Sequence, residues 1–142
     1  GLARLQSPHD QGMPLDQLAS LSHQLFQGGA TIVVLPPPRG EGLAENSVGL
    51  YQKVGVKYHL MAERARHILH SSFNGRRLVL YSDGAFGSGQ QLVEDTNSLA
   101  KGGSFGCVLR ENAFQRPKKE ALPLLAEMMD ALGGYNTGRN MR

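Results

Sequence analysis

The sequence predicts an α/β fold in which parallel strands alternate with helices. Two observations carry this prediction: short continuous apolar runs rich in β-branched residues, and longer segments between them with apolar residues at helical spacing. The 142 residues are about one domain's worth of chain. We therefore expect a single α/β domain over residues 1–132, followed by a flexible tail over residues 133–142, where no periodicity is visible.

Buried strands are predicted at residues 30–35 (ATIVVL), 77–82 (RLVLYS) and 104–109 (SFGCVL). The prolines at positions 36–38 end the first strand, because proline has no backbone N–H for a sheet. A polar or glycine-rich loop follows each run. Because the carboxyl ends of parallel strands meet at one edge of a sheet, we expect these loops to open side by side.

Amphipathic helices are predicted between the strands, at residues 14–27, within 51–72, at 89–100 and at 117–132. In the second of these, one helical face is expected to hold Leu60, Met61, Ala65, Ile68 and Leu69.

The last helix has the clearest boundaries in the sequence. Pro117 suits a first helical position and Gly133 suits a left-handed cap, while Pro123 predicts a kink or a later start. Its apolar residues are Leu122, Leu125, Met128, Met129 and Leu132.

The loop after the second predicted strand, SDGAFGSG, has the chemistry of an anion site. Gly84, Gly87 and Gly89 let backbone amides approach a ligand closely, and a helix starting near Gln90 would direct its positive end to the same place. A glycine-rich strand-to-helix turn is equally typical of a tight turn without a ligand. The spacing matches neither a P-loop nor the GxGxxG fingerprint of dinucleotide-binding folds.

Residues 80–132 resemble the C-terminal part of the bacterial and archaeal type of class I fructose-bisphosphate aldolase. The resemblance rests on LYSDGAFGSG, AKGGSFG and RENAFQRPKKEAL, and more weakly on VVLPPPRGEG and GVKYHLMAERARHIL. Members of that family are (β/α)8 barrels that form a lysine Schiff base with a phosphorylated ketose and need no cofactor. The resemblance therefore implies a partial or shortened (β/α)8 barrel, since a complete one takes about 200 residues or more.

The resemblance also implies which residues hold the substrate phosphate. Ser82, Asp83, Gly84 and Ala85 resemble the family's loop after the seventh strand, and residues 110–115 resemble the loop after the eighth. We expect Arg110 in this site, and Arg39 as a further anion contact at the same edge. Asp83 stands where the family usually has glycine, and Glu111 stands where it has the phosphate-binding arginine.

Lys57 is the candidate nucleophile. The sixth strand of the family carries the Schiff-base lysine, and the short segment between the helix ending near Ser72 and the strand at Arg77 has no room for such a strand. Lys57, in VGVKYHL, is the lysine upstream of the phosphate loops with a strand-like approach. A solvated surface lysine is the alternative interpretation.

Two functions follow from the sequence. The first is an aldolase-type lyase acting on a phosphorylated ketose through Lys57, and the second is a non-catalytic relative serving as a phosphate-binding or protein-interaction module. The open edges of a partial barrel favour a homo-oligomer or a partner chain.

Composition excludes other classes of protein. The net charge of +3 is dispersed and tryptophan is absent, which argues against a nucleic-acid surface. Neither a membrane span nor a signal-peptide pattern is visible, and a cytoplasmic location is expected. His67 and His70 have helical spacing, but without an acidic partner at ligand spacing we expect no metal site. Cys107 is expected to be a buried, unreactive thiol.

Overall fold

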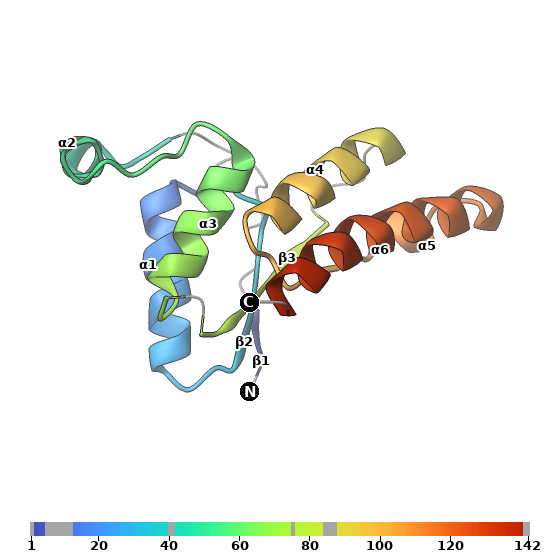
Figure 1. Cartoon of the computed structure of the whole chain (residues 1–142), viewed down its shortest axis with the longest axis horizontal. Helices are drawn as coiled ribbons and strands as arrows, with labels where there is room; N and C mark the ends of the chain where they lie inside the picture. Colours follow the sequence, from blue (N-terminus) through green and yellow to red (C-terminus); the bar gives the residue numbers. More distant parts are fainter. Residues whose placement is uncertain (1, 5–12, 40–41, 75, 84–87, 141–142) are drawn as a thin grey trace.

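A computed structural model of the chain describes residues 2–4, 13–39, 42–74, 76–83 and 88–140 (Figure 1). Its parallel sheet has the strand order β1-β2-β3-β4, formed by β1 (Leu2–Arg4), β2 (Ile32–Leu35), β3 (Leu78–Ser82) and β4 (Gly106–Val108). The helices are α1 (Leu15–Gln27), α2 (Glu45–Val54), α3 (Met61–Ser71), α4 (Gly89–Lys101), α5 (Glu111–Phe114) and α6 (Lys118–Asn140). The α/β class and its parallel strands are therefore confirmed.

The predicted strands are confirmed, and each is shorter than its apolar run. β2 ends at Leu35, immediately before the prolines, as expected. β2 pairs with β3 in the register Val33↔Val79, and β3 pairs with β4 in the register Leu80↔Gly106. The sequence did not predict β1, which pairs with β2 at one edge of the sheet. β4 lies at the other edge.

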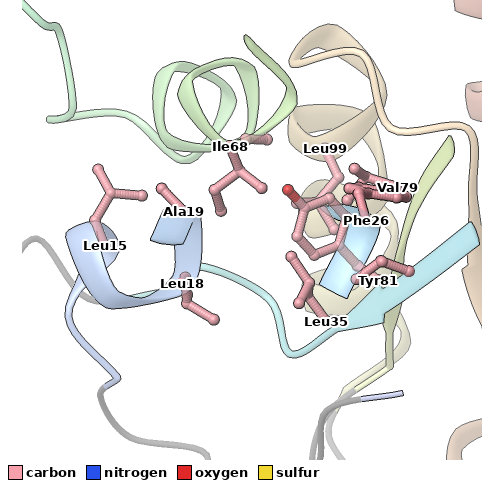
Figure 2. Close-up of a cluster of buried hydrophobic side chains, with 11 residues drawn as sticks. Leu15, Leu18, Ala19, Phe26, Leu35, Ile68, Val79, Tyr81 and Leu99 are labelled. Carbon is pink, nitrogen blue, oxygen red and sulfur yellow. The ribbon is translucent and has the colours of Figure 1, made fainter. Parts of the chain in front are cut away.

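One face of the sheet is covered by α1, α3 and α4. The side chains on this face alternate along β2 and β3, as the strand period requires. They join apolar residues of the three helices in a core cluster of Leu15, Leu18, Ala19, Phe26, Val33, Leu35, Ala65, Ile68, Val79, Tyr81 and Leu99 (Figure 2). α3 packs against α1 on one side and α4 on the other, so the helices form a continuous row.

The row of helices continues with α6, which lies beside α4 (Figure 1). Leu92 of α4 packs with Leu124 and Met128 of α6, and Cys107 of β4 contacts this second cluster. Tyr81 and Cys107 are paired across β3 and β4, so Cys107 points to the face that the helices cover. The same face of the sheet is therefore covered from β2 to β4.

The opposite face of the sheet carries five apolar side chains that belong to neither cluster. By alternation with the helix-facing positions they are Ile32 and Val34 of β2, Leu78 and Leu80 of β3, and Val108 of β4, and Ser82 and Gly106 lie on the same face. Val34 is buried, whereas the other four keep part of their surface accessible among the described residues. An apolar sheet face of this kind ordinarily packs against another layer.

The helices differ from the prediction where tertiary contacts decide burial. α2 was not predicted, and it has no buried residue and stands apart from the sheet in Figure 1. Leu60, expected on the apolar face of the helix, precedes α3 and is 64% exposed. Arg64, which was not expected on that face, is buried. α6 buries Leu124 rather than Leu122, which is exposed.

The C-terminal helix also extends past its predicted end. α6 accommodates Pro123 within its run and continues through Gly133 to Asn140, so the expected cap at Gly133 is wrong. The flexibility expected for residues 133–142 stays a prediction. No helix in the described part of the chain combines the length and apolar character needed to cross a membrane.

Candidate functional site

The carboxyl edge of the sheet brings together the residues that follow β2, β3 and β4, as expected. Arg39 follows β2, Asp83 follows β3 and Arg110 follows β4. The Asp83 amide donates a hydrogen bond to the Val108 carbonyl at 3.0 Å, which fixes the β3 end directly beside the β4 end. The predicted Gly84 and Ala85 lie outside the described residues.

The Asp83 carboxylate forms the centre of this edge. Its side chain is buried, and Oδ2 accepts hydrogen bonds from the Arg110 amide at 2.8 Å, the Asn112 amide at 3.3 Å and Asn112 Nδ2 at 3.3 Å. The Arg110 Nε lies 3.9 Å from Asp83 Oδ1. The resemblance placed Asp83 among the residues that hold the substrate phosphate. The carboxylate instead binds the donors of the β4 loop itself, as a phosphate oxygen would.

Asn112 is the partner of Asp83 to which the sequence assigned no role. Its side chain is 1% exposed, and its carbonyl and Oδ1 accept hydrogen bonds from Arg116 Nε at 2.9 Å and Arg116 NH2 at 3.2 Å. Asn112 thus connects Asp83 to Arg116. The sequence signal was available, because RENAFQR places these side chains four residues apart on one helical turn.

Arg39, the predicted anion contact, pairs with a carboxylate on α4. Its NH2 lies 2.7 Å from Asp95 Oδ2, and Asp95 Oδ1 accepts a hydrogen bond from Gln91 Nε2 at 3.0 Å. The Asp95 side chain is 10% exposed, whereas that of Arg39 is 37% exposed. The ion pair joins the loop after β2 to α4, and it neutralises the positive charge that was expected to attract a ligand.

Ser82, the last residue of β3, directs its hydroxyl toward β2. Ser82 Oγ donates to the Leu35 carbonyl at 3.5 Å, the outer limit of a hydrogen bond, and the residue is partly exposed. This contact links the ends of the two strands. Ser82 thus lies at the predicted edge, next to Asp83.

The start of α4 was expected to aim a positive helix end at an anion. α4 begins at Gly89, and the N-cap Ser88 Oγ accepts the hydrogen bond of the Gln91 amide at 3.2 Å. A groove of about 450 Å³ beside this end, between α4 and α6, is lined by Gly89, Gln90, Val93, Glu94, Glu120, Pro123, Leu124 and Glu127. Three of these residues are glutamates, so the groove repels a phosphate rather than attracting it.

Arg64 is a second residue whose role the sequence analysis missed. It is 5% exposed, and its guanidinium donates to the carbonyls of Pro38 at 2.6 Å, Tyr58 at 2.9 Å and His59 at 2.8 Å. These bonds hold the chain after β2 to the segment that enters α3. The sequence contained a signal for this role, because Arg64 lies three residues after Met61 and beside the expected apolar face of the helix.

Lys57 lies on no strand, so the strand-like approach expected for it is wrong. Gly55 ends α2 with a φ of 76°, a left-handed conformation that suits glycine. Val56 and Lys57 therefore follow the end of a helix and do not form a strand. The Lys57 side chain is exposed and lines a shallow pocket with residues of α3. The residues of this pocket do not include Ser82, Asp83 or Arg110. Its nucleophilic role stays a prediction.

Among the described residues, no cluster of histidine, cysteine, aspartate or glutamate side chains could hold a metal ion, and this includes the histidines of α3. His67 Nε2 instead lies 2.8 Å from the Tyr51 hydroxyl of α2. Burial lowers the pKa of His67 below its usual value, and the charge of the neighbouring His70 lowers it further. The neutral ring is therefore favoured, and it can accept the Tyr51 proton.

Cys107 was expected to be a buried, unreactive thiol, and the residue is partly buried. Burial raises the pKa of Cys107 to about 12, with smaller contributions from the charges of Asp83 and Asp95. A thiol with such a pKa is protonated at neutral pH and is a poor nucleophile.

Comparisons with protein-family models, with curated proteins and with solved structures found no match to this chain.

Proposed function

We propose that this chain is a non-catalytic relative of class I fructose-bisphosphate aldolases that serves as a protein-interaction module. The proposal takes up the resemblance of residues 80–132 to the end of that family's barrel. It proposes no catalytic activity, because the residues of β2 include no lysine.

The position of β2 is the observation that carries the proposal. If β3 and β4 correspond to the seventh and eighth strands of the family, the strand on the other side of β3 takes the place of the sixth, which bears the Schiff-base lysine. β2 pairs in parallel with β3 at this place, although it lies far from β3 in the sequence. Its residues are IVVL, followed by prolines at 36–38, and none is a lysine. Imine formation with a ketose therefore lacks its nucleophile on this strand.

The Asp83 carboxylate supports the same conclusion for the phosphate. The amides of Arg110 and Asn112, which lie in the loop that resembles the family's phosphate loop, already donate to Asp83 Oδ2. A phosphate group at these amides would have to displace a buried carboxylate and would face its negative charge. We infer that this edge holds the two loops together and does not take a sugar phosphate.

The open face of the sheet supports the interaction role. Ile32, Leu78, Leu80 and Val108 form an apolar surface that neither core cluster covers, and β1 and β4 are the two edges of the sheet. Parallel strands in sequential order with the helices on one face are also what the proposal of half a (β/α)8 barrel requires.

We propose a second copy of the chain as the partner. A two-fold axis parallel to the strands would place β4 of one copy beside β1 of the other at both edges, with all strands parallel. Two sheets of four strands would then close into a ring of eight, which buries both apolar faces and leaves no open edge.

Borohydride trapping tests the absence of catalysis. The chain is incubated with fructose 1,6-bisphosphate and sodium borohydride, and its intact mass is measured beside that of an active class I aldolase. We expect the active enzyme to gain the mass of the reduced adduct and this chain to gain none. An adduct on any lysine refutes the non-catalytic proposal, and its loss in Lys57→Met would identify Lys57 as the nucleophile.

Light scattering after size exclusion tests the interaction role. We expect a particle of twice the 15.4 kDa chain mass. Leu80→Asp, on the open sheet face, should shift the particle to a monomer, and Val54→Asp, on the 68% exposed surface of α2, should leave the dimer intact. A cooperatively melting monomer for the unchanged chain at all concentrations would rule out the second copy as partner.

A further inference from the structure

A basic pocket lies on the outer side of α3, separate from the carboxyl edge of the sheet. It has a volume of about 220 Å³ and is lined by Val56, Lys57, Glu63, Arg66, His67 and His70. The four α3 residues recur at three- and four-residue spacing, so they share one helical face, whereas Ala65 and Ile68 face the core. The segment that leaves α2 adds Lys57 at the rim.

The charges in this pocket are predominantly positive. Lys57 and Arg66 are exposed cations, and two imidazoles lie beside them. Among the described residues that line the pocket, Glu63 is the one carboxylate. Its Oε2 accepts the amide hydrogen bonds of His59 and Leu60, each at 3.1 Å, so this oxygen is committed to the start of α3.

The neighbouring groups hold the basic side chains in place. Arg66 NH2 donates to the Lys101 carbonyl at 3.2 Å, which anchors one nitrogen of a guanidinium that has five N–H donors. His67 is anchored through Nε2 to the Tyr51 hydroxyl at 2.8 Å, with the two rings edge to face at 5.0 Å. The fixed imidazole therefore has its second nitrogen, Nδ1, for another partner.

The two imidazoles of the pocket influence each other electrostatically. The charge of His70 lowers the pKa of His67 in addition to the effect of burial. An anion beside the rings would oppose this effect, because negative charge favours a protonated imidazole. Lys57 and Arg66, the cations that line the same pocket, would also stabilise negative charge there.

We propose that this pocket binds a phosphate group, with Arg66 and Lys57 as its charged ligands and His67 and His70 as hydrogen-bond donors. A volume of about 220 Å³ is smaller than the roughly 300–1,000 Å³ of pockets for drug-sized ligands, which suits a single tetrahedral oxyanion. Guanidinium and ammonium groups are the usual phosphate partners. The site is independent of the proposed dimer, since it lies on the far side of α3 from the sheet.

Inorganic phosphate is the first probe of this site. The chain is titrated with sodium phosphate at constant ionic strength and pH, with sodium chloride as the control, and the ring signals of His67 and His70 are followed by NMR. We expect saturable shifts of both rings with phosphate and none with chloride, together with a rise in the pKa of the His67 imidazole, which burial and His70 lower in the free chain. Equal shifts with the two salts would refute the site.

Matched variants locate the binding. Arg66→Gln should weaken phosphate binding about tenfold, the effect of one charge-assisted hydrogen bond, whereas Lys53→Gln on the exposed surface of α2 should leave it unchanged. Equal affinity of Arg66→Gln and the unchanged chain would overturn the assignment.

A second arm distinguishes free phosphate from a phosphate ester. Titration with glycerol 1-phosphate in place of phosphate should give the same or tighter binding if the biological ligand is an ester, and weaker binding if it is free phosphate. Neither probe should shift the amides of Arg110 and Asn112. Shifts there without shifts at His67 and His70 would return the anion site to the edge of the sheet and refute this proposal.

Discussion

Replacing Tyr81 by phenylalanine should stabilise the protein, because its hydroxyl is buried without a partner. Tyr81 is 1% exposed and its ring lies in the core cluster of Figure 2. Among the described residues and their groups, none forms a hydrogen bond with its hydroxyl. Burial raises the pKa of Tyr81 far above its usual value, so the phenol stays protonated. Its proton therefore has no acceptor inside the described core.

The magnitude follows from removing one polar atom and keeping the ring. A buried hydroxyl without a hydrogen bond costs about 1–3 kcal/mol, and the phenylalanine ring retains the apolar area. We expect Tyr81→Phe to raise the free energy of unfolding by about 1 kcal/mol at least, and the melting temperature by about 3 °C for a chain of this size.

Urea unfolding followed by circular dichroism measures this change. Tyr51→Phe is the matched control, because the Tyr51 hydroxyl is hydrogen-bonded to His67 and its removal should lower stability by about 0.5–1.5 kcal/mol. The two identical substitutions should therefore move the midpoint in opposite directions with unchanged slopes. Destabilisation by Tyr81→Phe of more than about 0.5 kcal/mol would refute the reasoning, since it would mean that the hydroxyl is satisfied.

Three further results are expected, two at glycines and one at His67. Gly102→Ala should destabilise by about 1–3 kcal/mol, because a Cβ there would lie 2.5 Å from Ala65 Cβ and 2.6 Å from the Ala62 carbonyl oxygen. Gly49→Ala, in α2 with nothing within 4 Å, should stabilise by up to about 1 kcal/mol, and thermal melts of both variants check the opposite signs. Because the folded state lowers the pKa of His67, its contribution to stability should be complete above about pH 6.5 and should be lost as the pH falls through its lowered value. Urea midpoints between pH 7.5 and 5 measure this loss, which His67→Gln should diminish; an unchanged pH profile in that variant would contradict it.

The architecture was largely predictable because it depends on local patterns. Short apolar runs predict β2, β3 and β4, and the helical spacing of apolar residues predicts α1 and α4. α2 escaped prediction for a physical reason, since a helix without a buried residue has no apolar stripe to detect.

The candidate site was predictable in its position and not in its chemistry. Arg39, Asp83 and Arg110 follow consecutive parallel strands, so their meeting at one edge was expected from the topology. Each of them has a partner within the protein. Arg39 forms an ion pair with Asp95. Asp83 accepts a hydrogen bond from the Arg110 amide and lies near the Arg110 guanidinium. Pairings of this kind join residues far apart in the sequence, which no local pattern encodes.

The sequence by itself therefore determined the class of the fold, most of its elements and the edge at which their loops converge, because periodicity and proline act over a few neighbouring residues. The tertiary structure alone decided that β2 lies directly beside β3 and that Arg64 is buried among carbonyl groups. It also decided that Asp83 accepts hydrogen bonds from the amides of the loop after β4. Burial and charge pairing depend on which distant groups remove water from a side chain. For this reason the Asp83 carboxylate, which accepts hydrogen bonds from the loop after β4, is the group that defines this edge of the sheet.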